Sequence, residues 1–365
     1  MPKFREWSTK VKILAVVLLI VYVSVWAIVG YVVGRKVAAA AEVKLLIGSL
    51  INENVVPAVA DISNPINGVF YTKKEAALWK DKVPLAVMIE NNVLARPHSG
   101  LSKADVVYEA LAEGATTRFM AVFLSNDSKK DVGPVRSARE YYFDWALEYN
   151  ASYAHWGGNE GVRALASKLF DKKDLDQFSI GTPTFFRRPP GGVHDAYTTT
   201  TGLWGIASLR GVNKAVEIDS WKFKEDSPLE KPKAGKITVS FLGDPDYVVA
   251  WQYDSKTNTY KRFNGGAAHK DKVYNKQLWA KTVIVQYVAD HGYKVITGVS
   301  NRNFQTTGSN KVLIFRDGKA VSGTWRKKSK TARTKFFDKK GKEIFLNRGI
   351  IWIEVIPGGS SVSYK

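Results

Sequence analysis

The chain has 365 residues, enough for more than one domain, and its hydrophobic content of 45% is typical of folded cores rather than disorder. Lysine and arginine outnumber aspartate and glutamate by 54 to 34, and the resulting net charge of +20 indicates a polyanionic partner. The sequence contains no cysteine, which excludes disulfides, thiolate catalysis, cysteine-ligated metals and a lipid-modified cysteine.

An apolar segment near the N-terminus predicts a membrane anchor. Residues 13–33 carry no charge and are long enough to cross a bilayer, which takes about 20 apolar residues. Basic residues are more numerous before this segment than after it, so residues 1–12 are expected to form a cytoplasmic tail. A cleaved signal peptide is the alternative, because the four alanines at 38–41 offer a cleavage site. Both alternatives export the chain, which argues against nucleic acid as its partner.

The rest of the chain divides by composition. Residues 34–68 are expected to be a stalk and linker. Strand-length apolar runs at 84–90, 105–111 and 118–124, with helices at 141–149 and from Asn159 to Ala166, predict an α/β or α+β domain over residues 69–218. The charged, proline-containing segment 219–236 is the predicted linker. Residues 237–365 predict a mostly β domain, with strands at 237–242, 247–253, 282–288, 293–297, 312–316, 334–337, 344–346 and 350–356.

Acidic and basic side chains are concentrated between residues 101 and 158. Asp105, Glu109 and Glu113 are four residues apart, so they are expected to share one face of either a helix or a strand. Ser137 with Glu140 three residues later is a capping-box pattern, which predicts a helix N-terminus there. The free N–H groups and the dipole of such a terminus favour an anion.

This pattern predicts an anion site of Arg118, Arg136, Ser137, Arg139, His155, Arg187 and His194, beside the acidic cluster. Arginine suits such a site because its planar guanidinium pairs bidentately with phosphate or carboxylate oxygens. Arg187 and His194 belong to a loop with two arginines and two glycines, which could close over the site. The alternative is a buried network in which the arginines pair with the three carboxylates.

The sequence does not name a reaction. Glu109 and Glu113 have the spacing for the acid and base of glycoside hydrolysis, which needs carboxyl groups about 5–9.5 Å apart, but nearby arginines would keep both groups ionised. The acidic cluster could also hold Mg²⁺ or Ca²⁺, but it lacks a defined loop spacing, so we assign no metal and no cofactor. Nucleophile, zinc and phosphate-loop motifs are absent from the sequence, and whether the protein is an enzyme stays open.

Four segments resemble the bacterial YerB-like lipoprotein family. They are residues 95–119 (ARPHSGLSKADVVYEALAEGATTRF), 133–140 (GPVRSARE), 315–327 (FRDGKAVSGTWRK) and 342–357 (KEIFLNRGIIWIEVIP). The resemblance implies a two-domain, membrane-tethered protein outside the cytoplasm, and it carries over no catalytic residue because the family has no established activity. The chain departs from the lipoprotein members because it has no cysteine, so a transmembrane helix would replace the lipid.

We therefore expect a single-pass cell-envelope protein that binds an anionic envelope polymer or a lipid-linked precursor. A non-enzymatic scaffold with protein partners is the alternative. A less favoured alternative is a glycosidase, or a glycopolymer transferase that shares the membrane anchor, arginines and acidic residues of the LytR-CpsA-Psr proteins. In the second domain the aromatic residues, including Trp251, Trp279, Trp325 and Trp352, are expected mainly to fill the core. The basic stretch 325–335 is expected to be a solvated turn that could contact anionic polymer.

Overall fold

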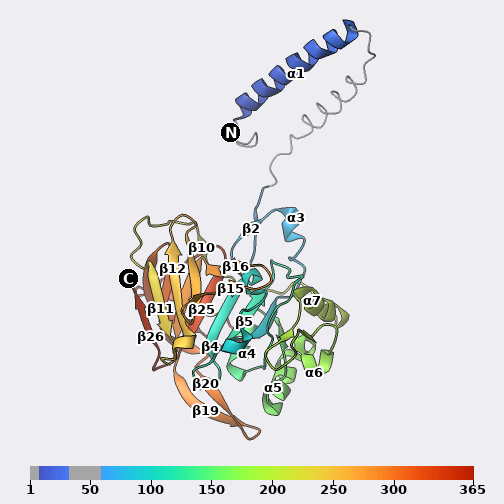
Figure 1. The fold of residues 1–365 in the computed structure, drawn as a ribbon. Coiled ribbons are helices and arrows are strands. Elements are labelled where there is room, and N and C mark those ends of the chain that lie inside the picture. The colour runs from blue at the N-terminus through green and yellow to red at the C-terminus, as the bar shows by residue number, and fades with distance from the viewer. Residues whose placement is uncertain (1–7, 33–58) are drawn as a thin grey trace. The chain divides into compact units, whose positions relative to one another are not determined.

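The structure is a computed structural model that describes residues 8–32 and 59–365 (Figure 1). Residues 1–59 and 60–365 are two units, and each is described by itself. In the first unit, helix α1 (Thr9–Val32) is the one described helix long and apolar enough to cross a membrane. A signal sequence would have the same features, so both alternatives for the N-terminus stay open. The proposed cleavage site at 38–41 and most of the predicted stalk lie outside the described residues.

A ten-stranded sheet forms the centre of the second unit, in the order β23-β22-β21-β18-β25-β4-β5-β3-β6-β7. Its strands are β3 (Leu85–Glu90), β4 (Val106–Leu111), β5 (Thr117–Phe123), β6 (Ser152–His155), β7 (Asp174–Asp176), β18 (Thr282–Tyr287), β21 (Gly308–Arg316), β22 (Lys319–Lys327), β23 (Lys335–Asp338) and β25 (Ile351–Ile356). Strand β25 runs parallel to both β4 and β18. Strands from both predicted domains therefore lie side by side in one sheet, and the boundary at 219–236 stays a prediction.

A second, antiparallel sheet of six strands packs against the first. Its strands are β11 (Lys236–Ser240), β12 (Val248–Asp254), β13 (Thr259–Asn264), β14 (Ala267–Ala268), β17 (Trp279–Ala280) and β26 (Ser361–Tyr364). The contact between the sheets includes Trp251 of β12 and Trp352 of β25, whose ring centroids lie 5.4 Å apart. Trp251, Trp325 and Trp352 are buried as predicted, whereas Trp279 is partly exposed.

Helices cover the sheet near its β3–β7 end (Figure 1). They are α4 (Glu140–Leu147), α5 (Glu160–Phe170), α6 (Gln177–Ile180) and α7 (Thr200–Leu209), while the short α3 (Lys73–Ala76) precedes the sheet in the chain. Tyr108 of β4 stacks on Trp145 of α4 with ring centroids 5.5 Å apart. Because side chains alternate along a strand, Glu109 points to the opposite face, toward the second sheet. With both faces covered, β3, β4 and β5 are buried throughout.

Two-stranded ribbons complete the fold. They pair β1 (Ile62–Ser63) with β2 (Phe70–Tyr71), β8 (Phe186–Arg187) with β9 (Ala196–Tyr197), β10 (Phe223–Lys224) with β24 (Leu346–Asn347), β15 (Lys270–Asp271) with β16 (Lys276–Gln277), and β19 (Asp290–Ile296) with β20 (Val299–Phe304). The β19–β20 ribbon extends from the lower edge of the molecule in Figure 1. The predicted fold class is confirmed: the chain has an N-terminal helix, a mixed α/β N-terminal region and a strand-rich C-terminal region.

The predicted capping box at Ser137 is wrong. Helix α4 begins at Glu140, and its N-cap, Arg139, makes no side-chain capping bond. The residues before it are extended instead, because the N–H of Arg136 donates to the carbonyl of Met88 at 3.0 Å and that of Ala138 donates to the carbonyl of Gly157 at 3.0 Å. A capping box is present at α3 instead, formed by Thr72 and Glu75, and it was not predicted from the sequence.

Two further predictions have clear outcomes. The Asn159 cap is confirmed, since its Oδ1 accepts from the N–H of Val162 at 2.9 Å. The expectation of a solvated turn at 325–335 holds for residues 328–331, which are exposed bends, but it is wrong for the flanking residues: Trp325 and Lys327 belong to strand β22 and are buried, and Arg333 is also buried. Because side chains alternate along β22, Lys327 is buried while Arg326 and Lys328 on either side of it are exposed. This alternation cannot be recognised in a continuous run of basic residues.

Candidate functional site

Glu113 joins two of the predicted anion-site arginines. Its Oε2 lies 3.1 Å from Nη2 of Arg118, and its Oε1 pairs with Nη2 of Arg139. The Glu113 side chain is 54% exposed, whereas those of Arg118 and Arg139 are 4% and 18% exposed. Arg118 is fixed further because its Nη1 donates to the carbonyl of Ser137 at 2.9 Å. Two held guanidinium groups therefore meet one carboxylate at the surface.

A pocket of about 410 Å³ opens beside this carboxylate, and we call it the Glu113 pocket. Its polar lining comes from Glu113, Ser137, Arg139, Asn159, Tyr293, Ser300, Asn301 and Arg302. Arg302 of β20 is held by Asp290, 3.1 Å from its Nη1, and by the carbonyl of Gly114, which accepts from its Nη2 at 2.8 Å. Arg302 was not predicted as a site residue, because strand β20, which carries it, was not recognised in the sequence.

Arg136 and His194 lie in a different group, around Glu90 at the end of β3. Arg136 Nε is 3.3 Å from Glu90 Oε1, and His194 Nδ1 is 2.9 Å from Glu90 Oε2. Arg187, the other predicted loop residue, pairs with Asp195 at 3.3 Å and stacks over Trp156. The loop does bring His194 to Arg136, but the shared partner is an acid that the sequence analysis did not single out.

His155 is buried at the β6–β7 side of the sheet. Its Nε2 lies 2.9 Å from Asp174 Oδ1, and its Nδ1 lies 2.7 Å from the carbonyl of Gly157. Both ring nitrogens are therefore occupied by partners within the fold. In this position His155 holds the turn at Gly157 to strand β7.

The three carboxylates that were expected to be co-facial have separate partners. Asp105 accepts from Asn67 Nδ2 at 2.6 Å and from the N–H of Leu124 at 2.6 Å, and burial raises its pKa. Glu113 lies at the surface, as described above. Glu109 is fully buried and belongs to a third cluster. The expected acidic cluster is therefore wrong as a single group, because Asp105 precedes β4 and Glu113 follows it, and only Glu109 lies within the strand.

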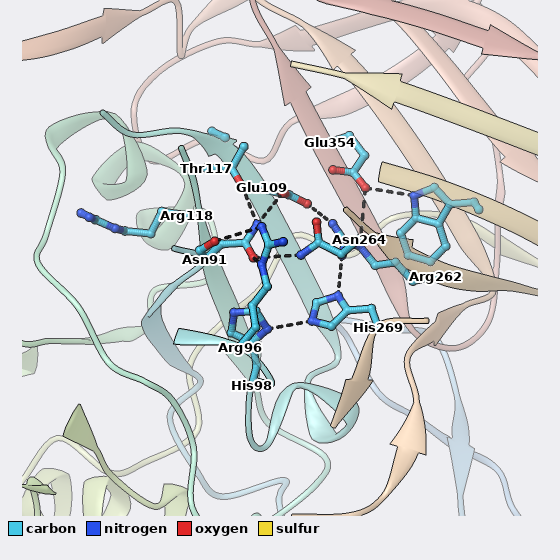
Figure 2. A network of polar contacts seen from close by, with 12 residues as sticks. Asn91, Arg96, His98, Glu109, Thr117, Arg118, Arg262, Asn264, His269 and Glu354 are labelled. Atoms are coloured by element: carbon cyan, nitrogen blue, oxygen red, sulfur yellow. Dashed lines mark hydrogen bonds and ion pairs between the residues drawn. The ribbon is translucent and has the colours of Figure 1, made fainter. Parts of the chain in front are cut away.

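Figure 2 shows the buried network around Glu109, which connects the two sheets. Arg262 of β13 pairs with Glu109 Oε2, and its guanidinium carbon lies 4.4 Å from the ring centroid of Trp352. Glu109 Oε1 also accepts from Thr117 and Asn91. The side chains of Arg262 and Glu109 have no exposed surface.

A second carboxyl group lies beside the same arginine. Glu354 Oε1 accepts from Trp251 Nε1 at 3.0 Å and lies 4.0 Å from Arg262 Nε. Burial, together with the charge of Glu109, raises the pKa of Glu354 well above its usual value. The raised pKa favours the neutral form of Glu354, which leaves Glu109 as the main counter-charge of Arg262.

Two histidines extend the network to the loop before β4. Arg262 donates to His269 Nδ1, and His269 Nε2 lies 2.8 Å from His98 Nδ1. Because arginine can only donate, His269 must carry its proton on Nε2 and donate it to His98. Burial and the nearby arginines lower the pKa of His98 to about 3 and that of His269 well below its usual value. Both rings are therefore neutral links in a chain of hydrogen bonds.

This geometry argues against Glu109 as a general acid, since Arg262, Thr117 and Asn91 occupy both of its carboxylate oxygens inside the fold. Within residues 8–32 and 59–365, no group of three or more His, Asp or Glu side chains is placed to hold a metal ion. Three of the predicted site residues, Glu113, Ser137 and Arg139, line the Glu113 pocket.

Comparisons with known proteins agree with the resemblance seen in the sequence. Residues 71–213 match the N-terminal domain of a protein family of unknown function, DUF3048, and residues 237–353 match its C-terminal domain. YerB of Bacillus subtilis strain 168, named as a candidate lipoprotein, is 28% identical over 305 residues, which are 82% of this chain and 89% of that protein. The crystal structure of the YerB protein from Bacillus subtilis matches with a TM-score of 0.70 at 28% identity, covering 83% of this chain and 100% of the other.

Proposed function

Because the chain belongs to the YerB-like family, with both DUF3048 domains, we propose that it is a membrane-anchored protein of the cell envelope that binds an anionic ligand in the Glu113 pocket. The apolar helix α1 supports a single-pass anchor with the folded unit outside the cytoplasm. A lipid anchor on cysteine is not available to this sequence.

The observation that carries the ligand proposal is the exposed carboxylate of Glu113 between two held arginines. A carboxylate that pairs with guanidinium groups has the same negative charge, and accepts the same kind of hydrogen bonds, as a ligand carboxylate or phosphate. Because Glu113 is half exposed while Arg118 and Arg139 are not, the acid is the partner that can turn away. An incoming anion would then take over its hydrogen bonds.

Unused donors near the pocket support the same proposal. The Nε groups of Arg118 and Arg302 are buried and have no hydrogen-bond partner in the part of the chain that the structure describes. Buried donors normally have a hydrogen-bond acceptor, so each of these two N–H groups could donate to an acceptor atom of a bound ligand. The volume of about 410 Å³ suits a small phosphate- or carboxylate-bearing group, since ligand pockets usually start at about 300 Å³.

The test measures pyrophosphate binding by the full-length chain, using calorimetry and thermal shift. Arg139→Ala should abolish binding while leaving the fold intact. Glu113→Gln should tighten binding about tenfold, or 1.4 kcal/mol, because it removes a partly screened negative charge that competes with the ligand. Glu140→Gln is the matched control, because Glu140 pairs with Lys294 nearby but does not line the pocket.

Weaker pyrophosphate binding by Glu113→Gln, together with unchanged binding by Arg139→Ala, would contradict the proposal. The alternative is then a non-enzymatic scaffold. The β19–β20 ribbon favours that alternative, because Tyr293, Val295 and Val299 on it are exposed and apolar.

A further inference from the structure

We propose that a second pocket binds a linear polymer that carries several phosphate groups. This pocket, which we call the Arg333 pocket, has a volume of about 1170 Å³. It lies where the end of α4, residues 217–219 and strands β21, β22 and β23 meet. None of its lining residues lines the Glu113 pocket, so the inference is independent of the ligand proposed there.

Arg333 is the unusual residue of this pocket. Its side chain has no exposed surface, and its guanidinium carbon lies 3.7 Å from the ring centroid of Trp221 and 4.1 Å from that of Tyr149. In the described part of the chain, none of its three side-chain nitrogens has a hydrogen-bond partner. The nearest carboxylate, Glu148, is 3.8 Å from Nη1. Arg333 is therefore a cation held between two rings with its donors unused.

The neighbouring Lys327 shows that the fold can pair a buried cation here. Its Nζ donates to the carbonyl of Asp144 at 3.0 Å, to Glu148 Oε1 at 2.9 Å and to the carbonyl of Ala332 at 2.6 Å. Glu148 also accepts from the hydroxyl and N–H of Thr334. The buried acid is thus occupied by other partners, which leaves the donors of Arg333 for an acceptor from outside the protein.

Basic residues outnumber acidic ones around the pocket. Its lining has five basic side chains, Arg326, Lys327, Lys328, Arg333 and Lys335, and three acidic ones, Glu148, Glu217 and Asp219. Asp219 is paired with Lys335 at 2.9 Å. Arg326 and Lys328 are exposed, so an approaching anion meets these two residues first, and the buried Arg333 lines the same pocket.

Shape and size favour a polymer over a membrane surface or a single anion. A lipid surface is nearly flat and cannot enter a concave pocket, whereas a flexible chain can. A volume of about 1170 Å³ exceeds the roughly 300–1,000 Å³ of ordinary small-molecule sites, so one phosphate would leave most of the pocket unfilled. Several phosphates along one chain could bridge the exposed residues and the buried arginine.

The test uses the full-length chain in phosphatidylcholine nanodiscs and a fluorescently labelled linear polyphosphate, titrated at increasing salt. Arg326→Gln combined with Lys328→Gln should weaken binding at low salt at least tenfold. It should also reduce the slope of log K against log salt by about 2, because about one counterion is released for each phosphate contact. Lys339→Gln combined with Lys340→Gln removes the same charge from an exposed turn outside the pocket and should change neither quantity.

Four results would overturn the inference. Equal losses in the test and control variants would indicate a response to net charge alone. Inorganic phosphate that competes as well as polyphosphate would indicate a single-anion site. Binding to phosphatidylglycerol vesicles but not to polyphosphate would indicate a membrane surface. If Arg139→Ala alone abolished polyphosphate binding, this inference would fail while the Glu113 pocket remained supported.

Discussion

Replacement of Arg262 tests whether the buried network holds the two sheets together. Arg262→Met keeps a long apolar side chain among Phe119, Trp251 and Trp352 but leaves Glu109 buried without its counter-charge. Removing one partner of a buried ion pair costs about 3–5 kcal/mol. We therefore expect Arg262→Met to lower the free energy of unfolding by about that amount.

Urea denaturation followed by tryptophan fluorescence measures this change. If the dependence on urea is about 3 kcal/mol per M, the midpoint should fall by about 1–1.7 M. Glu109→Gln added to Arg262→Met should recover most of the loss, because no charge is then buried. Glu354→Gln is the control: burial favours the neutral form of this carboxyl, so an amide of similar shape should cost less than about 1 kcal/mol.

Two outcomes would refute this reasoning. A loss below about 1 kcal/mol in Arg262→Met would mean that water or another group solvates Glu109, which a sealed network does not allow. A double variant as unstable as Arg262→Met would mean that lost packing on Trp352, rather than the unpaired charge, causes the effect.

Three further predictions concern pH, helix glycines and the anchor. His98 and His269 have lowered pKa values, so below about pH 6.5 the unfolded chain binds more protons than the folded chain. The free energy of unfolding should therefore fall as the pH is lowered toward 3, by about 1.4 kcal/mol per pH unit for each histidine. His98→Asn, compared with the unchanged chain in urea at several pH values, should remove one such contribution; an unaltered slope would contradict this. Gly205→Ala in α7 should raise the free energy of unfolding by about 0.5–1 kcal/mol, because the added Cβ meets no atom within 4 Å. Gly161→Ala in α5 should bring no such gain, because its Cβ would lie 2.5 Å from Ile296 on the β19–β20 ribbon. Faster hydrogen exchange of the ribbon in Gly161→Ala alone would support this contact, and equal stabilisation by both changes would refute it. Finally, full-length protein should stay with membranes after alkaline carbonate extraction, and a soluble mature form that begins after Ala41 would favour the signal peptide.

Local patterns in the sequence predicted much of the fold. The runs at 84–90, 105–111 and 118–124 are strands because they are apolar on both faces, and Asn159 caps a helix because its side chain reaches an N–H three residues on. Strands β13, β20, β22 and β26 were missed. Polar and basic residues interrupt them, as in Val299–Phe304, and only their partners in the sheets reveal them.

The candidate site was harder to predict because charge pairing depends on tertiary contacts. The sequence places Glu113 near Arg118 and Arg139, and the structure joins all three. The same spacing could not show that Glu109 faces Arg262, because the two residues lie on strands of different sheets. It also could not show that Arg333 is buried, because a basic residue in the connection between two strands can be either exposed or buried.

The place of β25 in the large sheet has a consequence for biosynthesis. Strand β4, which pairs on one side with β5, receives its other neighbour only when residues 351–356 have been made. Until then its outer edge has unpaired N–H and C=O groups, which can pair with other chains. Such long-range pairing also slows folding. A product of premature termination before Ile351 would keep this edge open and be prone to aggregation and proteolysis, so only chains that include residues 351–356 can complete the sheet.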